Sequence, residues 1–396
     1  MSYATPIPVK AGDKWYLVFG SGPTDYDGSS SQDGYLFVVD MKTGDLLKQF
    51  GPFEGQAFFG TAASIDKNLN YNVDAIYVGD TYWASNKWLG SLYKIAIPCS
   101  NCEWDSNYDP ATDFGYDTDP ANWTVHKIFE SDRPITAAPS ISVESYPSLD
   151  VDNVWVYFGT GRFLDNADKL STDQEYLYGI KDPFFNSKYT TSVHDYAASA
   201  LITLDRSHLF AGDSVVVTAG GYVLDSGSLA LHNGSGNFTD LVDEVRQNYD
   251  GWYRPLDTNG TLASERMISK PSIFGGLSFF AAFTPSGDIC KNNGSTNFYA
   301  LYFLTGTGYT KQILNILNPD SVTFTVDGNS LTQDVVAVKL DKALIGAPPP
   351  SVGLHTGKEE GAKAYVQMST GVVEQLSVGS AIYMKSAITD WWDRVD

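Results

Sequence analysis

The segments Ala137-Ala138-Pro139-Ser140-Ile141 and Val156-Tyr157-Phe158-Gly159-Thr160-Gly161 are two parts of the unit that decides the fold of this chain. The first part is a strand that opens with proline, and the second is an apolar strand that ends in small residues. Both parts recur. Copies of the first lie at 4–7, 269–273 and 347–352, and copies of the second lie at 17–22, 216–221 and 366–371. Repeats spaced by a few tens of residues are typical of propellers and solenoids.

A third strand that ends in a tight turn completes the unit, as in Tyr35–Gly44 and Phe298–Gly306. Three such strands and an outer strand make a propeller blade, and glycine lets strands pack closely near a crowded axis. We therefore predict an all-β, modified β-propeller with loop insertions that occupies residues 1–396 as one domain. About 40 to 50 residues per blade predicts seven blades. Insertions between second and third strands are expected on one face, at 23–34, 162–175 and 285–297.

The composition excludes two classes of partner. The chain has 47 acidic and 26 basic residues and a net charge of −21, without the basic clusters that bind phosphate. Nucleic-acid binding is therefore excluded. No segment approaches the roughly 18 consecutive apolar residues of a membrane span, so we expect no membrane insertion. The first residues have neither the charged nor the apolar region of a signal peptide, and we interpret the chain as the C-terminal part of a longer exported protein.

A run from Asp66 to Asp74 carries an oxygen-bearing side chain at every odd position and leads into the strand-like 75–80. Ca²⁺ prefers six to eight oxygen ligands from one such loop. The pattern predicts that side-chain oxygens come from four residues and a backbone carbonyl from a fifth, Asn72, as at the seventh position of an EF-hand loop. The four side chains are those of Asp66, Asn68, Asn70 and Asp74.

Two features of this run predict a weak calcium site. The sixth position is Tyr71, where an EF-hand loop has glycine for a sharp turn, and only two of the ligands are carboxylates. The alternative is an Asx-rich turn between strands, because Asn and Asp favour turns. Two other acidic segments are interpreted as solvated connectors: Asp25–Asp33 and a loop with Asp105, Asp109, Asp113, Asp117 and Asp119.

The chain has three cysteines, and two of them lie close together in Cys99-Ser100-Asn101-Cys102. A zinc site would need a second pair or nearby histidines, and a redox motif would need a βαβ context. The pair is therefore interpreted either as a local disulfide formed in an oxidising compartment or as inert thiols, and Cys290 stays unpaired.

Taken together, these residues resemble the C-terminal propeller of the PilY family, exported proteins associated with the tip of bacterial type IV pili. The resemblance extends over nearly the whole chain and depends on the order of its motifs. The segments that carry it are 66–80, 154–164, 176–182, 251–253 and 269–285.

The resemblance implies a pilus biogenesis factor and adhesin whose calcium occupancy bears on pilus extension and retraction. It implies pilins or minor pilins at the pilus tip, and a host or abiotic surface, as partners. It also implies an extracellular location, at the cell surface, after export through the periplasm. The family's calcium pattern carries over onto Asp66, Asn68, Asn70, Asn72 and Asp74.

Two other function classes fit a propeller, because fold alone does not give function. Quinoprotein dehydrogenases share the architecture, but many have two adjacent cysteines beside the cofactor, and this chain has none. Its histidines lie in no hydrolase motif such as G-x-S-x-G, so we expect that the protein is not an enzyme. A carbohydrate-binding propeller is the third possibility, since the chain has 24 Tyr and 9 Trp. Most of these aromatics lie in strand patterns, where packing explains them.

Overall fold

The structure, a computed structural model, describes residues 4–67, 69–99, 115–146, 151–185, 202–230, 236–258, 263–288, 290, 293–316, 319–340, 344–346, 348, 352–357, 361–367 and 373–378. In these ranges strands dominate, and α-helix is confined to α1 (Phe238–Asn248). No helix in the described ranges is long and apolar enough to cross a membrane.

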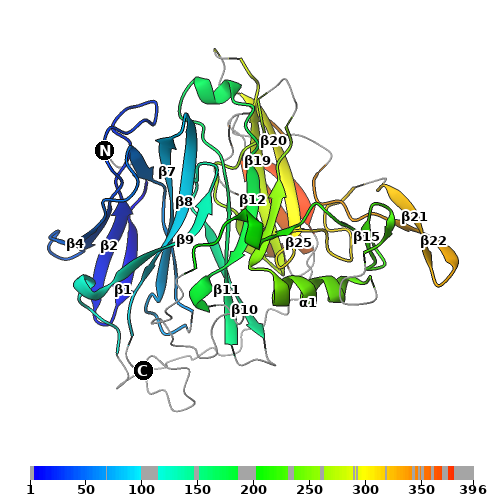
Figure 1. Cartoon of the computed structure of the whole chain (residues 1–396), viewed down its shortest axis with the longest axis horizontal. Helices are drawn as coiled ribbons and strands as arrows, with labels where there is room; N and C mark the ends of the chain where they lie inside the picture. Colours follow the sequence, from blue (N-terminus) through cyan, green and yellow to red (C-terminus); the bar gives the residue numbers. More distant parts are fainter. Residues whose placement is uncertain are drawn as a thin grey trace, which may run out of the picture.

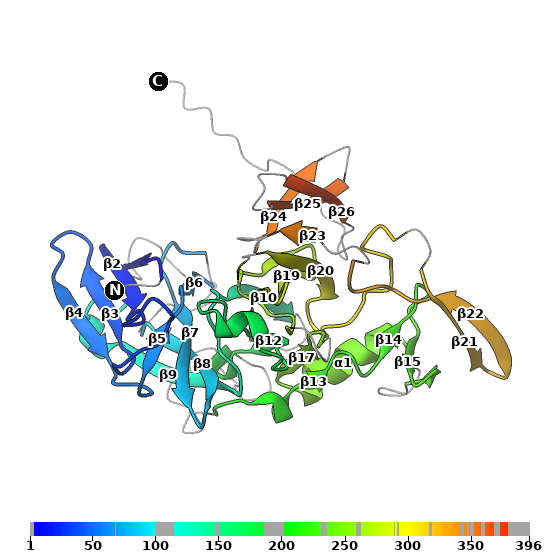
Figure 2. The same ribbon diagram turned by 90° about the horizontal axis from the view of Figure 1, so that it is seen from above.

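Five sheets follow one another along the described chain, and we call them blades 1 to 5 (Figures 1 and 2). Blade 1 contains β1 (Ile7–Ala11), β2 (Lys14–Gly20), β3 (Leu36–Asp40) and β4 (Leu46–Phe50). Blade 2 contains β5 (Ala57–Phe59), β6 (Ala63–Ile65), β7 (Ala75–Ala84), β8 (Lys87–Ala96) and β9 (Thr124–Ser131). Blade 3 contains β10 (Ser140–Tyr146), β11 (Val151–Gly159), β12 (Tyr176–Lys181), β17 (Gly251–Pro255) and β13 (Phe210–Ala211).

Blade 4 contains β18 (Ser272–Phe274), β19 (Leu277–Pro285), β20 (Gly294–Tyr302) and β23 (Leu344–Gly346). Blade 5 contains β24 (Val352–Gly357), β25 (Gly361–Gln367) and β26 (Val373–Val378). All pairs within the blades are antiparallel except β13 with β17. The described residues thus form five blades, and the number of seven stays a prediction.

The innermost strands meet from one blade to the next. β1 contacts β6, β6 contacts β10, β10 contacts β18, and β18 contacts β24. All of these except β6 follow a proline of the predicted motif. Ser140 Oγ donates to the carbonyl of Pro271 at 2.6 Å, and Ser272 Oγ donates to the carbonyl of Val352 at 2.7 Å. The serine after the proline therefore joins blade 3 to blade 4 and blade 4 to blade 5.

Successive residues of a strand face the two neighbouring blades in turn, because side chains of a strand alternate in direction. In β11, Val154, Val156 and Phe158 pack in a core with blade 2, whereas Trp155 and Tyr157 pack in a core with blade 4. A strand buried on both faces appears in the sequence as a continuous apolar run. This explains why the second strand of the unit is apolar in the sequence.

Glycine at the end of the second strand lets the blades approach, as the sequence predicted. A Cβ at Gly20 would clash with Phe59 of blade 2, and one at Gly159 would clash with Met267 before blade 4. Larger residues there would separate neighbouring blades.

Two insertions interrupt the repeat. One holds α1 and a small sheet of β14 (Val216–Val217), β15 (Val223–Asp225) and β16 (Ser228–Leu229), and the other is the projecting hairpin of β21 (Ser321–Val326) and β22 (Asn329–Asp334) (Figure 2). The copy of the repeat at 216–221 was therefore wrong, since β14 belongs to no blade. Short 3-10 turns lie at Pro120–Asn122, Ala167–Leu170, Pro183–Phe185 and Arg206–His208.

Helix α1 forms because its ends and its spacing favour it. The Asn237 side chain accepts the backbone N–H of Asp240 at 3.0 Å and caps the first turn. The buried residues are spaced so that they form one apolar face, which packs between blades 3 and 4: Phe238, Leu241, Val242 and Val245.

The predicted insertions at 23–34 and 162–175 do connect second and third strands, β2 to β3 and β11 to β12. The third is shorter than predicted, because β19 continues to Pro285 and β20 begins at Gly294. In blade 2 the same connection is a tight turn at Ser85 and Asn86, both with positive φ.

Candidate functional site

The Asp66–Asp74 loop joins β6 to β7, and three backbone hydrogen bonds hold its C-terminal end. The N–H of Asp74 donates to the carbonyl of Ile65 at 2.9 Å, and the N–H of Val73 donates to the carbonyl of Lys10 in β1 at 2.9 Å. The carbonyl of Asp74 accepts from Ile97 at 3.2 Å. The loop therefore lies where blade 1 meets blade 2.

Asp66 closes the turn at the start of the loop. Its Oδ1 accepts the N–H of Asn70 at 3.1 Å, and its Oδ2 accepts the N–H of Tyr71 at 2.6 Å. Leu69 and Tyr71 have φ of 60° and 68°, the left-handed conformation that favours glycine. Tyr71 thus makes the sharp turn for which an EF-hand loop uses glycine, and its side chain is exposed.

Asp74 supplies the second carboxylate and is only 9% exposed. Its Oδ2 accepts the N–H of Lys67 at 2.6 Å, and its Oδ1 accepts the hydroxyl of Tyr116 at 2.7 Å. Burial raises the pKa of the Asp74 carboxyl above its ordinary value, while the hydrogen bond from Tyr116 opposes this rise. A cation beside Asp74 would favour the ionised carboxylate.

Two asparagines complete the described part of the donor set. Asn70 Oδ1 accepts the N–H of Asn72 at 2.9 Å. Asn72 is 1% exposed, and its Oδ1 has no hydrogen-bond partner among the described residues. A buried oxygen without a partner is costly, so this atom fits a role as a ligand. The sequence had assigned Asn72 only its backbone carbonyl.

The loop therefore places four of the predicted ligands on one turn: Asp66, Asn70, Asn72 and Asp74. Asn68 lies outside the described residues. Within the described ranges no three His, Cys, Asp or Glu side chains converge as a metal cluster. The donors of this loop are two carboxylates and amide oxygens, which are the hard oxygen donors that calcium prefers.

The sequence did not predict the part that Tyr116 plays in the loop. Its hydroxyl lies between Asp74 Oδ1 and Asn70 Nδ2, which donates to it at 3.0 Å. Tyr116 pairs with Cys99 in an antiparallel bridge, and Cys99 is disulfide-bonded. Its partner lies outside the described residues, whereas Cys290 is an exposed free thiol, so the disulfide alternative for Cys99 is correct.

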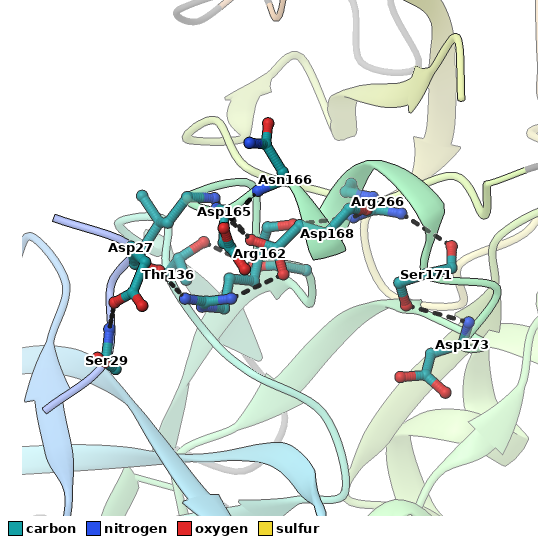
Figure 3. A network of polar contacts seen from close by, with 12 residues as sticks. Asp27, Ser29, Thr136, Arg162, Asp165, Asn166, Asp168, Ser171, Asp173 and Arg266 are labelled. Atoms are coloured by element: carbon teal, nitrogen blue, oxygen red, sulfur yellow. Dashed lines mark hydrogen bonds and ion pairs between the residues drawn. The ribbon is translucent and has the colours of Figure 1, made fainter. Parts of the chain in front are cut away.

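Arginines fasten the connections on one face (Figure 3). Arg162 Nη1 donates to Asp168 Oδ1 at 2.7 Å, Nη2 donates to the carbonyl of Asp27, and the guanidinium lies 4.0 Å from the ring centre of Trp88. Blades 1, 2 and 3 therefore meet at this side chain. Arg266 clamps the same connection by donating to the backbone carbonyls of Arg162, Asp168 and Ser171.

The other acidic segments act as caps where they are described. Asp27 Oδ1 accepts the N–H of Ser29 at 2.8 Å, and Asp119 caps the turn at 120–122. Asp105, Asp109 and Asp113 lie outside the described residues. His208 lies in the capped turn at 206–208, where its Nδ1 is hydrogen-bonded to Asp205 Oδ1 at 3.0 Å.

Comparison with known proteins agrees with this architecture. A family model described as the PilY1 β-propeller domain matches residues 1–207, more than half of the chain. A type IV pilus biogenesis factor PilY1 homolog from Xylella fastidiosa is 25% identical over 323 residues, covering 78% of this chain. The chain spans 19% of that relative's length.

A crystal structure of the Pseudomonas aeruginosa PilY1 C-terminal domain superposes with a TM-score of 0.60 at 20% identity, over 96% of this chain and 72% of that one. This similarity concerns the fold. The predicted all-β propeller is confirmed, and the chain belongs to the PilY1 β-propeller family.

Proposed function

We propose that this chain is the calcium-binding propeller of a type IV pilus biogenesis factor that acts at the pilus tip, outside the cell. Membership of the PilY1 family supports the pilus role. The observation that carries the calcium role is the Asp66–Asp74 loop, with two carboxylates and a buried Asn72 oxygen without a partner. In the proposed role, calcium occupancy controls whether the pilus extends or retracts.

In this proposal Asp66 and Asp74 supply the negative charge, and Asn68, Asn70 and Asn72 supply neutral oxygens. The bound ion would neutralise the two carboxylates and hold the start and the end of the loop together. With only two carboxylates the dissociation constant should lie near that of extracellular modules, about 10⁻⁴ to 10⁻³ M. Occupancy would then follow the calcium concentration outside the cell.

The proposed partners are pilins or minor pilins and a host or abiotic surface, recognised by the connections between second and third strands. Loops held on a rigid scaffold are where binding residues concentrate. Arg162 and Arg266 hold the 160–175 connection to its neighbours, so this face is ordered before a partner arrives. Preorganisation reduces the entropy lost on binding.

The proposed role is binding and not catalysis. The three cysteines include no adjacent pair of the kind found beside a quinone. Among the described histidines, His208 caps a turn and His126 contacts Thr124 at 2.9 Å. Turnover of an alcohol or sugar with added quinone would contradict this part of the proposal.

Calcium should stabilise the folded chain through its loop. A ligand that binds the folded state alone stabilises it by RT ln(1 + [L]/Kd), or about 1.4 kcal/mol at ten times Kd. We expect millimolar calcium to raise the melting temperature of the wild type and to leave that of Asp74→Ala unchanged, because the variant lacks one of the loop's two carboxylates. Calorimetric titration of both proteins checks the binding itself.

The matched control is Asp13→Ala, which removes an exposed aspartate outside the loop, in blade 1, and should respond to calcium like the wild type. Equal stabilisation of the wild type and Asp74→Ala would leave the loop as an Asx turn. The pilus role has a separate test, in a strain whose full-length gene is deleted. Unchanged piliation, twitching and attachment in this deletion strain would contradict the pilus role. Introducing Asp74→Ala into the full-length gene tests the calcium control of the pilus.

A further inference from the structure

We infer that Tyr116 positions two ligands of the calcium loop, and that the disulfide at Cys99 sets how firmly it does so. The inference rests on the proposed calcium function and adds to it a residue and a constraint that lie outside the loop. Three observations carry it: the hydroxyl contacts of Tyr116, its burial, and the pairing of its backbone with Cys99.

The Tyr116 hydroxyl joins ligands from two parts of the loop. It donates to Asp74 Oδ1 at 2.7 Å and accepts from Asn70 Nδ2 at 3.0 Å. The first contact fixes the direction of the Asp74 carboxylate. The second holds the Asn70 amide against the hydroxyl, from which its Oδ1 lies 3.4 Å away. Ligands held by such partners are preorganised, and loss of the partner typically costs about 10- to 100-fold in metal affinity.

Tyr116 itself is held by the core and not by the loop. It is 5% exposed and belongs to the apolar core between blades 1 and 2, together with Tyr16, Ile97 and Trp123. Its ring therefore cannot follow the loop if the loop moves. The hydroxyl is a fixed point against which Asn70 and Asp74 are oriented.

The disulfide-bonded Cys99 is the backbone pairing partner of Tyr116. The chain continues from β8 to Cys99, which pairs with Tyr116, and the N–H of Asp117 donates to Pro98 at 2.8 Å. Ile97, two residues before Cys99, donates to the carbonyl of Asp74. A disulfide restricts the conformations of the segment that it closes. Without it, the pairing of Cys99 with Tyr116 should loosen and Tyr116 should orient the ligands less well.

The test measures the calcium Kd of the chain by calorimetry, with calcium-free melting temperatures alongside. We expect Tyr116→Phe to weaken calcium binding about 10-fold or more. Cys99→Ser should weaken it by a smaller factor. The double variant should bind no more weakly than Tyr116→Phe alone, because the disulfide acts through the hydroxyl that this variant lacks.

The matched control is Tyr299→Phe. Tyr299 is 3% exposed, and its hydroxyl donates to the carboxylate of Glu265 at 2.6 Å, in blade 4. This variant should lose stability as Tyr116→Phe does and keep the wild-type Kd. A purely structural role for Tyr116 would lower the melting temperature and leave the Kd unchanged, which would overturn the inference.

The outcomes also separate this inference from the proposed function. Absence of calcium binding by the wild type would remove both. Binding by the wild type, none by Asp74→Ala and wild-type affinity in Tyr116→Phe would remove only the inference. Additive effects of Tyr116→Phe and Cys99→Ser would refute the link to the disulfide. Should Cys99→Ser not fold, the comparison of Tyr116→Phe with Tyr299→Phe still decides the positioning role.

Discussion

Asp80 is a carboxylic acid buried where ionisation is costly. It follows Gly79 in β7 and is 0% exposed. Its Oδ1 accepts the N–H of Ser91 at 2.6 Å, whereas its Oδ2 has no hydrogen-bond partner among the described residues. Burial, opposed by the bond from Ser91 and by the charge of Lys127, raises the pKa of Asp80 to about 8. At neutral pH the protonated acid therefore predominates.

The pH dependence of stability follows from this shift. The unfolded carboxyl titrates near 3.8, so between the two values the folded chain holds a proton that the unfolded chain has lost. The stabilisation is fully present below pH 3.8 and is lost as the pH rises through about 8. Without calcium, we expect the melting temperature of the wild type to fall more than that of Asp80→Asn between about pH 5 and about pH 8.5.

Thermal denaturation followed by circular dichroism at several pH values checks this expectation. Asp13→Asn, an exposed control in blade 1, should follow the wild type. Parallel profiles for the wild type and Asp80→Asn would show that Asp80 is ionised throughout.

The ligands of the candidate site differ in how far the sequence predicts them. Asp66, Asn70 and Asp74 were predicted as ligands from their spacing, because the ligands of one loop are local in sequence. Tyr116 was missed, because it lies 42 positions from Asp74 and a buried tyrosine has no local pattern. The buried Oδ1 of Asn72 was missed because side-chain burial depends on the packing of blade 1 against blade 2.

At the scale of elements, the proline-led inner strand was predicted and its function was not. Proline has no N–H to donate, and so it suits the first residue of a strand. The serine that follows it donates its hydroxyl to the next blade, at Pro271 and at Val352. The contact joins residues far apart in sequence, so no local pattern could predict it.

Loss of these serine hydroxyls should weaken the junctions between blades. Ser140→Ala and Ser272→Ala should each lower the free energy of unfolding by about 1 kcal/mol, because each leaves a carbonyl without its donor. Chemical denaturation monitored by fluorescence measures the change. Ser321→Ala, at an exposed position of β21, should change it by less than about 0.5 kcal/mol. Equal effects at all three positions would show that the inter-blade bonds contribute nothing.

The false copy at 216–221 shows where the sequence interpretation failed at this scale. Val216–Gly221 has the composition of the second strand, but small residues that end a strand also mark turns. Only the pairing of β14 with β15 distinguishes the two cases, and that pairing is a tertiary fact. The irregular stretch that follows contains α1, which the repeat could not predict.

At the scale of the whole molecule, Arg162 connects parts that are distant in the chain. Its guanidinium, 4% exposed, bonds the carbonyl of Asp27 in blade 1, lies over Trp88 in blade 2 and pairs with Asp168 in blade 3. A buried ion pair that loses one partner leaves an uncompensated charge, which typically costs about 3 to 5 kcal/mol. The face of the connections therefore depends strongly on one side chain.

Arg162→Ala should increase local opening of the connections on this face more than opening of the rest of the chain. We expect faster amide hydrogen exchange in 21–35 and 160–175, with a smaller change in the strands of blades 4 and 5, because the described partners of the guanidinium lie in blades 1 to 3. Exchange measured by mass spectrometry resolves the segments. Lys42→Ala removes an exposed cation of blade 1 and should change neither segment. Uniformly faster exchange over all blades would contradict the expectation.

The alternation in β11 has an evolutionary consequence. Odd and even positions of this strand belong to different cores, so the strand evolves as two interleaved sequences, one matched to each neighbouring blade. Substitutions at Trp155 and at Val156 are then selected independently. A deletion of one residue would instead exchange the two sets and misplace every side chain beyond it. Across homologues, β11 should therefore tolerate many substitutions and almost no changes in length.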